Sequence, residues 1–125
     1  MPKIVHLALK VEDLEKATVF YETVLGFTSM SETNFSDHTS RHMSDGAIDL
    51  ALIKYHRESP EALASGKGPC IHHFGIEVED VEACAEKLMA AGCEIISAPG
   101  DLPVKFRDPN GVVAELVPAG RYKTP

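Results

Sequence analysis

The stretch "IHHFGIEVEDVEAC" (residues 71–84) decides the fold, because it repeats the earlier segment "IVHLALKVEDLEKA" (residues 4–17). The two segments align without a gap, each residue having its counterpart 67 positions later. The match pairs His6 with His73 and Val11-Glu12-Asp13 with Val78-Glu79-Asp80. Self-similarity of this kind indicates two copies of one supersecondary unit.

Each copy has the pattern of a strand followed by a helix. Residues 4–11 alternate, with Val5, Leu7 and Leu9 on one apolar face and His6 on the other. Asp13 and Asp80 then stand where a helix N-cap is expected. Apolar stripes with helical spacing follow: Leu14, Ala17, Tyr21, Val24 and Leu25 in the first copy, and Val81, Cys84, Leu88 and Ala91 in the second. The glycines Gly26 and Gly92 are predicted to end the two helices.

Three short strands are predicted after each helix. They cover 27–32, 38–44 and 47–54 in the first copy, and 93–98, 103–107 and 111–117 in the second. The turns "SDG" (44–46) and "DPNG" (108–111) have hairpin composition. We therefore predict one α+β domain over residues 1–125, built from two βαβββ modules. The first module covers 1–55, a linker 56–69, the second module 70–118 and a C-terminal tail 119–125.

Composition narrows the possible partners. The chain has 125 residues and a net charge of −7, and its basic residues are scattered, which argues against nucleic acid or an anionic membrane as partner. No apolar run approaches the length of a membrane span. The three cysteines are an odd number without metal-type spacing, which favours a reducing, cytoplasmic setting.

Four polar residues are predicted on the sheet face opposite the helices. His6 and His73 occupy equivalent positions of the two copies, Asp49 alternates with the apolar residues of "AIDLALI" (47–53), and Glu115 is the lone acid of "VVAELV" (112–117). An acid is costly to bury unless it is paired or bound to a metal. Two imidazoles with one or two carboxylates suit Zn²⁺, Ni²⁺, Co²⁺, Mn²⁺ or Fe²⁺. The alternative for each residue alone is a hydrogen-bonded structural histidine or a solvent-facing acid.

The repeat also separates the adjacent histidines of "IHHF" (71–74). His73, the counterpart of His6, is predicted to point into the cleft. His72, the counterpart of Val5, is predicted on the helix-facing side near the strand end. There it is expected to be partly exposed or to donate a hydrogen bond to a metal-binding residue.

Three longer stretches resemble the vicinal oxygen chelate superfamily, which includes glyoxalase I: "HLALKVEDLEKATVFYETVLGF" (6–27), "HFGIEVEDVEA" (73–83) and "FRDPNGVVAELV" (106–117). The resemblance implies paired βαβββ modules in a curved mixed sheet, with a divalent metal in the cleft. It also implies that His6, Asp49, His73 and Glu115 are the metal ligands. Glyoxalase I-like members carry Glu, and epimerase-like members Gln, where this chain has Asp49. The resemblance therefore leaves open whether Asp49 binds directly, binds through water, or leaves a site of two histidines and Glu115.

The resemblance further implies a reaction. The leading hypothesis is a lyase or isomerase like lactoylglutathione lyase, which chelates two neighbouring substrate oxygens and moves a carbon-bound proton through an enediolate. Glu115 is then the base, and Asp49 its partner on the opposite side. The alternatives are an epimerase of the methylmalonyl-CoA type, an Fe(II) ring-cleaving dioxygenase, and a protein that only binds an antibiotic such as bleomycin. A homodimer is expected, in which one active site could combine residues of both chains.

Further residues are candidates for contacts with the substrate. Lys10 and Glu77 are expected to pair or to line the cleft, and the segment 33–40 is expected to be a loop near it. The candidates for binding an anionic substrate are Arg41, His42, Lys105, Arg107, Arg121 and Tyr122.

Overall fold

The chain folds into two βαβββ modules joined side by side, which confirms the predicted α+β class. The computed structural model describes residues 1–122; the predicted tail continues to residue 125, outside the described residues. The first module contains β1 (Lys3–Lys10), α1 (Leu14–Thr23), β2 (Thr28–Asn34), β3 (His38–Ser44) and β4 (Asp49–Tyr55). The second contains β5 (Cys70–Val78), α2 (Val81–Ala90), β6 (Glu94–Ile95), β7 (Val104–Arg107) and β8 (Val113–Pro118).

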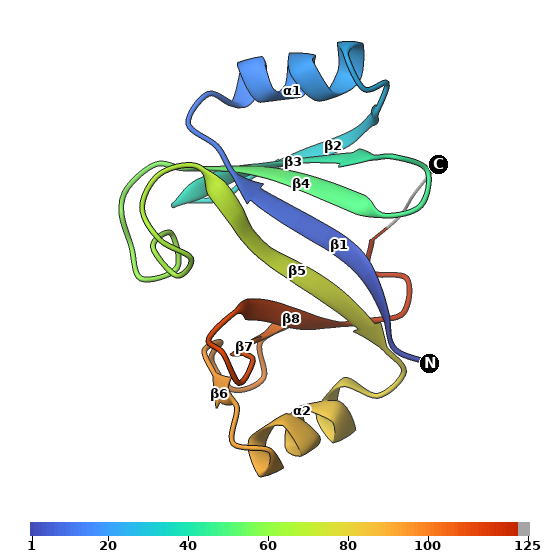
Figure 1. Cartoon of the computed structure of the whole chain (residues 1–125), viewed down its shortest axis with the longest axis vertical. Coiled ribbons are helices and arrows are strands. Elements are labelled where there is room, and N and C mark those ends of the chain that lie inside the picture. Colours follow the sequence, from blue (N-terminus) through green and yellow to red (C-terminus); the bar gives the residue numbers. More distant parts are fainter. Residues whose placement is uncertain (123–125) are drawn as a thin grey trace.

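The strands of both modules form one curved, mixed sheet. Its order is β2-β3-β4-β1-β5-β8-β7-β6, so the first strands of the two modules lie next to each other. β1 runs antiparallel to β5, β1 runs parallel to β4, and β5 runs parallel to β8. Figure 1 shows β1 and β5 side by side in the middle, with α1 and α2 at opposite ends of the molecule. The four strands with the predicted site residues are therefore the four central ones.

The helices cover one face of the sheet. Each begins where its N-cap aspartate accepts a backbone hydrogen bond, from Lys16 N to Asp13 and from Ala83 N to Asp80. The apolar side of α1 packs on β3 and β4, where Met43, Leu50 and Leu52 are buried. The apolar side of α2 packs on Val78, Phe106, Ala114 and Leu116. This arrangement leaves the opposite face, here called the inner face, free for polar residues.

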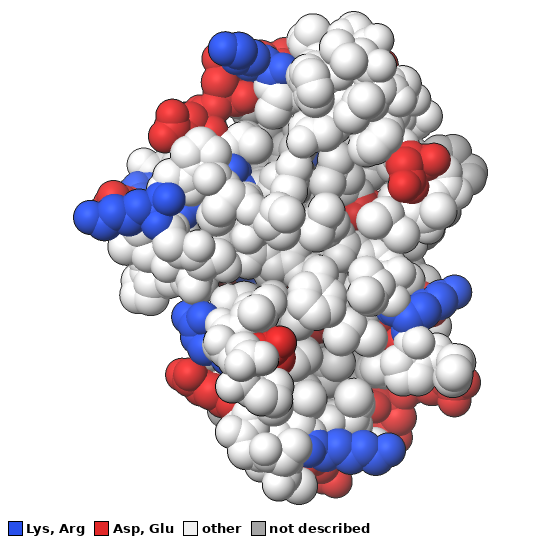
Figure 2. Space-filling view, viewed as in Figure 1, with Lys and Arg blue, Asp and Glu red and all other residues white. Residues whose placement is uncertain are grey.

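On the face shown in Figure 2, lysines and arginines stand apart at the margins, and the middle is largely uncharged. That distribution agrees with a net charge of −7 and forms no basic surface on this face. Among residues 1–122, no helix combines the length and apolar character needed to cross a membrane.

Two of the predicted element boundaries are wrong. The expected loop 33–40 is mostly strand: β2 extends to Asn34 and β3 begins at His38, and Phe35 N donates to His38 O (2.8 Å) in the turn between them. The polar composition was misleading because β2 is an edge strand with every side chain exposed. The expected strand 93–98 is only two residues long, Glu94–Ile95. Ile96 N and Ser97 N both donate to the same carbonyl, that of Lys105, so the regular pairing between β6 and β7 ends there.

The segment 56–69 packs against the inner face at the C-terminal end of β1, where Lys10 lies. The Lys10 ammonium group is nearly buried and donates to Ala62 O (2.7 Å) and Gly66 O (2.6 Å). The expected pairing of Lys10 with Glu77 is wrong, because β1 and β5 are antiparallel and their register puts Lys3 beside Glu77. Lys3 Nζ lies 3.6 Å from the Glu77 carboxylate. Lys10 therefore holds the segment 56–69 in place.

Replacing Lys10 with methionine is expected to loosen this segment. The carbonyls of Ala62 and Gly66 lose their charged donor, which should lower the free energy of unfolding by about 1–3 kcal/mol. Chemical denaturation measures the loss, and hydrogen exchange should be faster over residues 59–66. Lys3→Met, on the same strand but with an exposed side chain, is the control and should change neither quantity. Equal stability of the two variants would contradict this role of Lys10.

Candidate metal centre

The structure brings the four predicted site residues together on the inner face. His6 on β1 and Asp49 on β4 are directly opposite each other in the parallel register, while His73 lies on β5 and Glu115 on β8. Each of the four is at most 4% exposed. They come close because β4, β1, β5 and β8 are consecutive in the sheet.

Three of the four residues converge on one point. His73 Nε2 lies 2.9 Å from Glu115 Oε1 and 3.3 Å from His6 Nε2. His6 Nε2 lies 4.0 Å from the second oxygen, Glu115 Oε2. The ligand atoms of the trio all lie within 4.8 Å of one another, a spacing that one ion could bridge.

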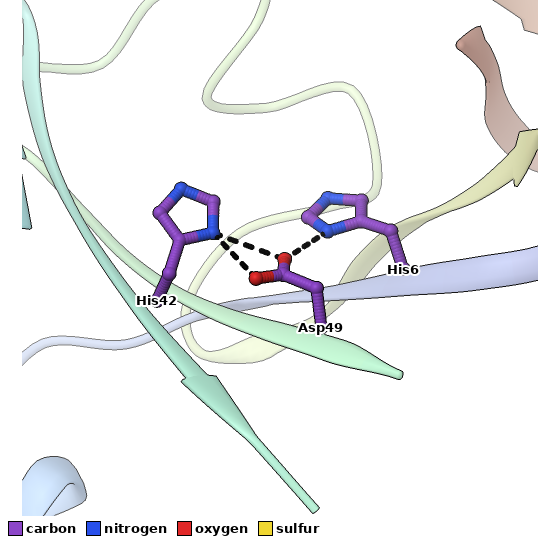
Figure 3. A group of neighbouring side chains, drawn as sticks. All are labelled: His6, His42 and Asp49. Carbon is purple, nitrogen blue, oxygen red and sulfur yellow. Dashed lines mark hydrogen bonds and ion pairs between the residues drawn. The ribbon is translucent and has the colours of Figure 1, made fainter. Parts of the chain in front are cut away.

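Asp49 contacts the other nitrogen of His6. Its Oδ2 is 2.6 Å from His6 Nδ1, and both its oxygens lie within 3.0 Å of His42 Nδ1, so the carboxylate sits between two imidazoles (Figure 3). Burial alone would raise the pKa of Asp49, but the hydrogen bonds from His42 and His6 outweigh it and lower the pKa. An ionised Asp49 only accepts hydrogen bonds, so His6 Nδ1 carries the proton. The lone pair of His6 is then on Nε2, facing His73 and Glu115.

Tyr122 closes this centre from the C-terminal side. Its hydroxyl donates to Glu115 Oε2 (2.5 Å), and its ring stacks on that of His6 with centroids 4.1 Å apart. Burial would raise the pKa of Glu115, but hydrogen bonds from His73 and Tyr122 and the nearby His6 hold it at about 2. Burial also raises the pKa of the Tyr122 phenol, which therefore remains a donor.

The three converging residues fit a divalent metal ion. Glu115 is ionised, burial lowers the pKa of His73, and His6 presents a lone pair. Acceptor atoms packed at about 3 Å repel one another unless a cation lies between them, either a proton or a metal ion. Two imidazole nitrogens and one carboxylate oxygen match the preference of Zn²⁺, Ni²⁺, Co²⁺ or Fe²⁺. The carboxylate of Asp49 at His6 Nδ1 is the kind of partner that metal-binding histidines usually have.

Comparison with known proteins identifies the superfamily of the chain. The model of the Glyoxalase/Bleomycin resistance protein/Dioxygenase superfamily matches residues 3–116. The chain belongs to this superfamily. It is 28% identical to a probable lactoylglutathione lyase of Vibrio cholerae, over 92% of this chain and 89% of that protein. It is 33% identical to an ethylmalonyl-CoA/methylmalonyl-CoA epimerase of Cereibacter sphaeroides, over 89% of this chain and 93% of that protein. The crystal structure of methylmalonyl-CoA epimerase from Mycobacterium tuberculosis has the same fold, with a TM-score of 0.74 and 21% identity over 92% of this chain and 86% of that one.

Two hollows of this glyoxalase-superfamily protein are lined by residues that neighbour the candidate centre in sequence or in space. One, of about 430 Å³, lies on the side of the first module and is lined by Ser31, Phe35, His42, Asp49, Arg121 and Tyr122. The other, of about 770 Å³, lies on the side of the second module and is lined by Pro60, His72, Leu102, Lys105 and Arg107. The smaller hollow reaches the centre through Asp49 and Tyr122, which contact His6 and Glu115, whereas no residue of the trio itself lines either hollow.

The basic residues predicted to meet an anionic substrate fall into three groups. Arg41 forms ion pairs away from the centre, with Glu32 at 2.6 Å and Glu15 at 2.9 Å. Lys105 and Arg107 line the larger hollow, but Lys105 pairs with Glu61 (3.2 Å) and Arg107 donates to the Ala64 carbonyl (3.2 Å). His42, Arg121 and Tyr122 line the smaller hollow. Of these, His42 and Tyr122 contact the four-residue centre itself, through Asp49 and Glu115.

The predicted position of His72 is wrong. His72 is 1% exposed and lies on the inner face, with its Nδ1 2.8 Å from His73 Nδ1. The cause is a β-bulge: Ala8 pairs with His73 and Leu9 with Ile71, so His72 is an extra residue in β5. A bulge interrupts the alternation of side chains, and the sequence pattern alone did not show it.

Gly75 provides the space that His6 occupies. It pairs with His6 on one side and with Glu115 on the other, and a Cβ at Gly75 would lie 2.9 Å from His6 Cβ and 3.1 Å from its Cδ2. We therefore expect Gly75→Ala to displace the His6 ring. The free energy of unfolding should fall by about 1–3 kcal/mol, because the core is overpacked there. Denaturation and metal titration of the variant check this, and unchanged stability together with unchanged metal affinity would contradict it.

Proposed function

We propose that the protein is a metal-dependent lyase or isomerase that moves a carbon-bound proton in a small substrate with two neighbouring oxygens. The observation that supports this most strongly is the convergence of His6 Nε2, His73 Nε2 and the Glu115 carboxylate at one buried point. The superfamily, whose curated relatives include a lyase and an epimerase, supports the same class of chemistry.

In this proposal His6, His73 and Glu115 hold the metal, and Asp49 orients His6 by accepting its Nδ1 proton. A bound divalent metal would polarise the two substrate oxygens and stabilise negative charge on them. The buried position of the trio excludes bulk water and so strengthens these electrostatic effects.

Glu115 is proposed as the base. Its Oε1 lies 2.9 Å from His73 Nε2, while its Oε2 accepts from Tyr122 and lies 4.0 Å from His6 Nε2. The Tyr122 hydrogen bond is one of the interactions that lower the pKa of Glu115. A substrate that displaces the tyrosine hydroxyl from Oε2 would therefore raise the basicity of Glu115 at the oxygen it uses to take the proton.

Asp49 is less suited to act as a second base, because both its oxygens already accept from His6 and His42. A single carboxylate, that of Glu115 after a substrate has displaced the Tyr122 hydroxyl, suffices when a proton moves between adjacent carbons on the same side. This geometry favours the lyase reading.

An epimerase is the second candidate. Epimerisation needs a proton to leave one face of a carbon and return to the other, so a second acid–base group is required. His42 could supply it, since Asp49 holds its Nδ1 and it lines the smaller hollow with a side chain 22% exposed. The epimerase relative, at 33% identity, gives this alternative specific support.

A screen of metals and substrates tests the proposal. Metal-free protein is loaded separately with Ni²⁺, Zn²⁺, Co²⁺, Mn²⁺ or Fe²⁺, and each form is assayed with the methylglyoxal–glutathione hemithioacetal, acyl-CoA epimers and catechols. We expect one metal per chain and turnover of the hemithioacetal. Turnover of the epimers alone would establish the second candidate, and ring cleavage by the Fe²⁺ form would establish a dioxygenase. Failure of every metal to bind would refute all three enzymatic readings and favour an antibiotic-binding protein.

We also propose that the protein functions as a homodimer in the cytoplasm. One chain assembles all four predicted site residues, so the centre itself needs no residue from a second chain. Sedimentation equilibrium measures the oligomeric state directly, and a monomer at micromolar concentration would contradict the dimer.

A further inference from the structure

We propose that Tyr122 is a gate that selects which molecules reach the base. Its phenol occupies the position that the reacting part of a substrate must take, so the C-terminal tail has to move away before Glu115 can act. This inference rests on the proposed function, because it concerns access to the same base. It goes beyond that function, because it makes the observed conformation a closed and inactive one that a bound substrate or a substitution opens.

Tyr122 stands between the smaller hollow and the trio. It lines the hollow, its hydroxyl donates to Glu115 Oε2 (2.5 Å), and its ring lies nearly parallel to that of His6, at an angle of 8°. Asp49, on the same wall, contacts His6 from the Nδ1 side. A small molecule that enters from this hollow therefore meets the phenol before it meets Glu115 Oε2.

The phenol and a substrate cannot use Glu115 at the same time. A base must lie within hydrogen-bond reach of the proton that it takes. Glu115 Oε2 is at that distance from the Tyr122 hydroxyl, and Oε1 is 2.9 Å from His73 Nε2, so both oxygens already have partners. The Tyr122 ring also covers one face of His6, a proposed metal ligand, with centroids 4.1 Å apart. The centre is thus closed to a substrate while the phenol is in place.

The tail that carries Tyr122 is built to move. After β8 ends at Pro118, Gly120 N donates to the Glu77 carboxylate at 3.2 Å. Arg121 N donates to Pro118 O at 3.3 Å, so both backbone hydrogen bonds are long. Gly120 has a φ of +79°, and a glycine enters and leaves this left-handed region without a steric penalty. The hydrogen bond of the Tyr122 hydroxyl is short and charge-assisted by contrast, so we assign the latch to Tyr122 and the hinge to Gly120.

A gate of this kind favours substrates that fill the smaller hollow. Closure competes with binding, so the apparent affinity for a substrate falls with the fraction of molecules that are open. A ligand that displaces the phenol must replace its hydrogen bond to Glu115 and its stacking on His6 with contacts of its own. The hollow of about 430 Å³ offers room for such contacts, whereas water and very small ligands gain too little there to open the gate.

Two variants separate the latch from the ring. Tyr122→Phe keeps the ring but removes the donor to Glu115, and Tyr122→Ala removes both. Tyr21→Phe is the control, because it removes a phenol hydroxyl from α1, where Tyr21 stacks on Phe27. The first readout is the set of NMR NOEs between the ring protons of residue 122 and those of His6 in metal-free protein. The second is kcat and KM of the metal-loaded protein for the methylglyoxal–glutathione hemithioacetal, or for an acyl-CoA epimer if the parent turns over only that.

We expect strong NOEs in the parent and in Tyr21→Phe, and weaker ones in Tyr122→Phe, because an unlatched ring leaves His6 for part of the time. KM should fall about tenfold in Tyr122→Phe, the effect of losing a hydrogen bond to an ionised group, and at least as far in Tyr122→Ala. The value of kcat should not fall, since a saturating substrate opens the gate in the parent as well.

Three results would overturn the proposal. The first is a parent without these NOEs, and the second is a folded Tyr122→Phe protein that keeps them at full strength. The third is a lower kcat in both Tyr122 variants without a lower KM, because that result makes Tyr122 a participant in the reaction or a structural support. If the parent turns over neither substrate, the proposed function fails, while the NOEs of metal-free protein still decide whether Tyr122 closes the centre.

Discussion

Replacing His73 with alanine is expected to abolish stoichiometric metal binding. His73 Nε2 is the atom closest to both other members of the trio, at 2.9 Å from Glu115 Oε1 and 3.3 Å from His6 Nε2. Loss of one of three protein ligands should weaken binding on the order of a thousandfold, because each ligand supplies several kcal/mol of the total. Equilibrium dialysis with metal analysis measures this loss for Zn²⁺ and Co²⁺.

The matched control for this experiment is His56→Ala. His56 is an exposed histidine that contacts Thr39 and lies outside the centre. Thermal unfolding of the metal-free variants separates loss of the site from loss of the fold. A folded His73→Ala protein that retains one tightly bound metal per chain would place the site elsewhere.

The second large effect is expected for Glu115→Gln. The amide keeps the shape of the side chain and an oxygen for Tyr122, but it cannot take a proton from carbon. Turnover should therefore fall by about 10²–10⁴-fold. Metal affinity should fall much less than in His73→Ala, because an amide oxygen can still coordinate.

Steady-state kinetics with the substrate found in the screen, together with the metal content of each sample, checks this prediction. Glu79→Gln, at an exposed acid on the same module, is the control and should have parental turnover. A Glu115→Gln protein with full turnover would remove Glu115 as the base. The result would then direct attention to His42, a titratable group that lines the smaller hollow.

Much of the fold could be predicted because its signals are local. The 67-residue repeat, the N-cap aspartates Asp13 and Asp80 and the strand alternation each depend on residues close in sequence. The shared face of His6 and His73 followed from their equivalent positions in two like modules. Signals of this kind survive in the folded chain because they reflect backbone geometry. The strand β2 was predicted, but its end at Asn34 was placed in a loop, since an edge strand exposed on both faces has no apolar pattern.

The sequence by itself thus determined the two modules, their order of elements and the four residues that share the inner face. Only the tertiary structure decided how those residues meet. It placed Asp49 at Nδ1 of His6 rather than with the trio, brought Tyr122 from the tail onto Glu115, and turned His72 inward through a bulge. The physical reason is that side-chain direction follows alternation only while strand pairing is regular. Bulges, ring orientations and contacts from a distant segment depend on register and packing between strands far apart in the sequence.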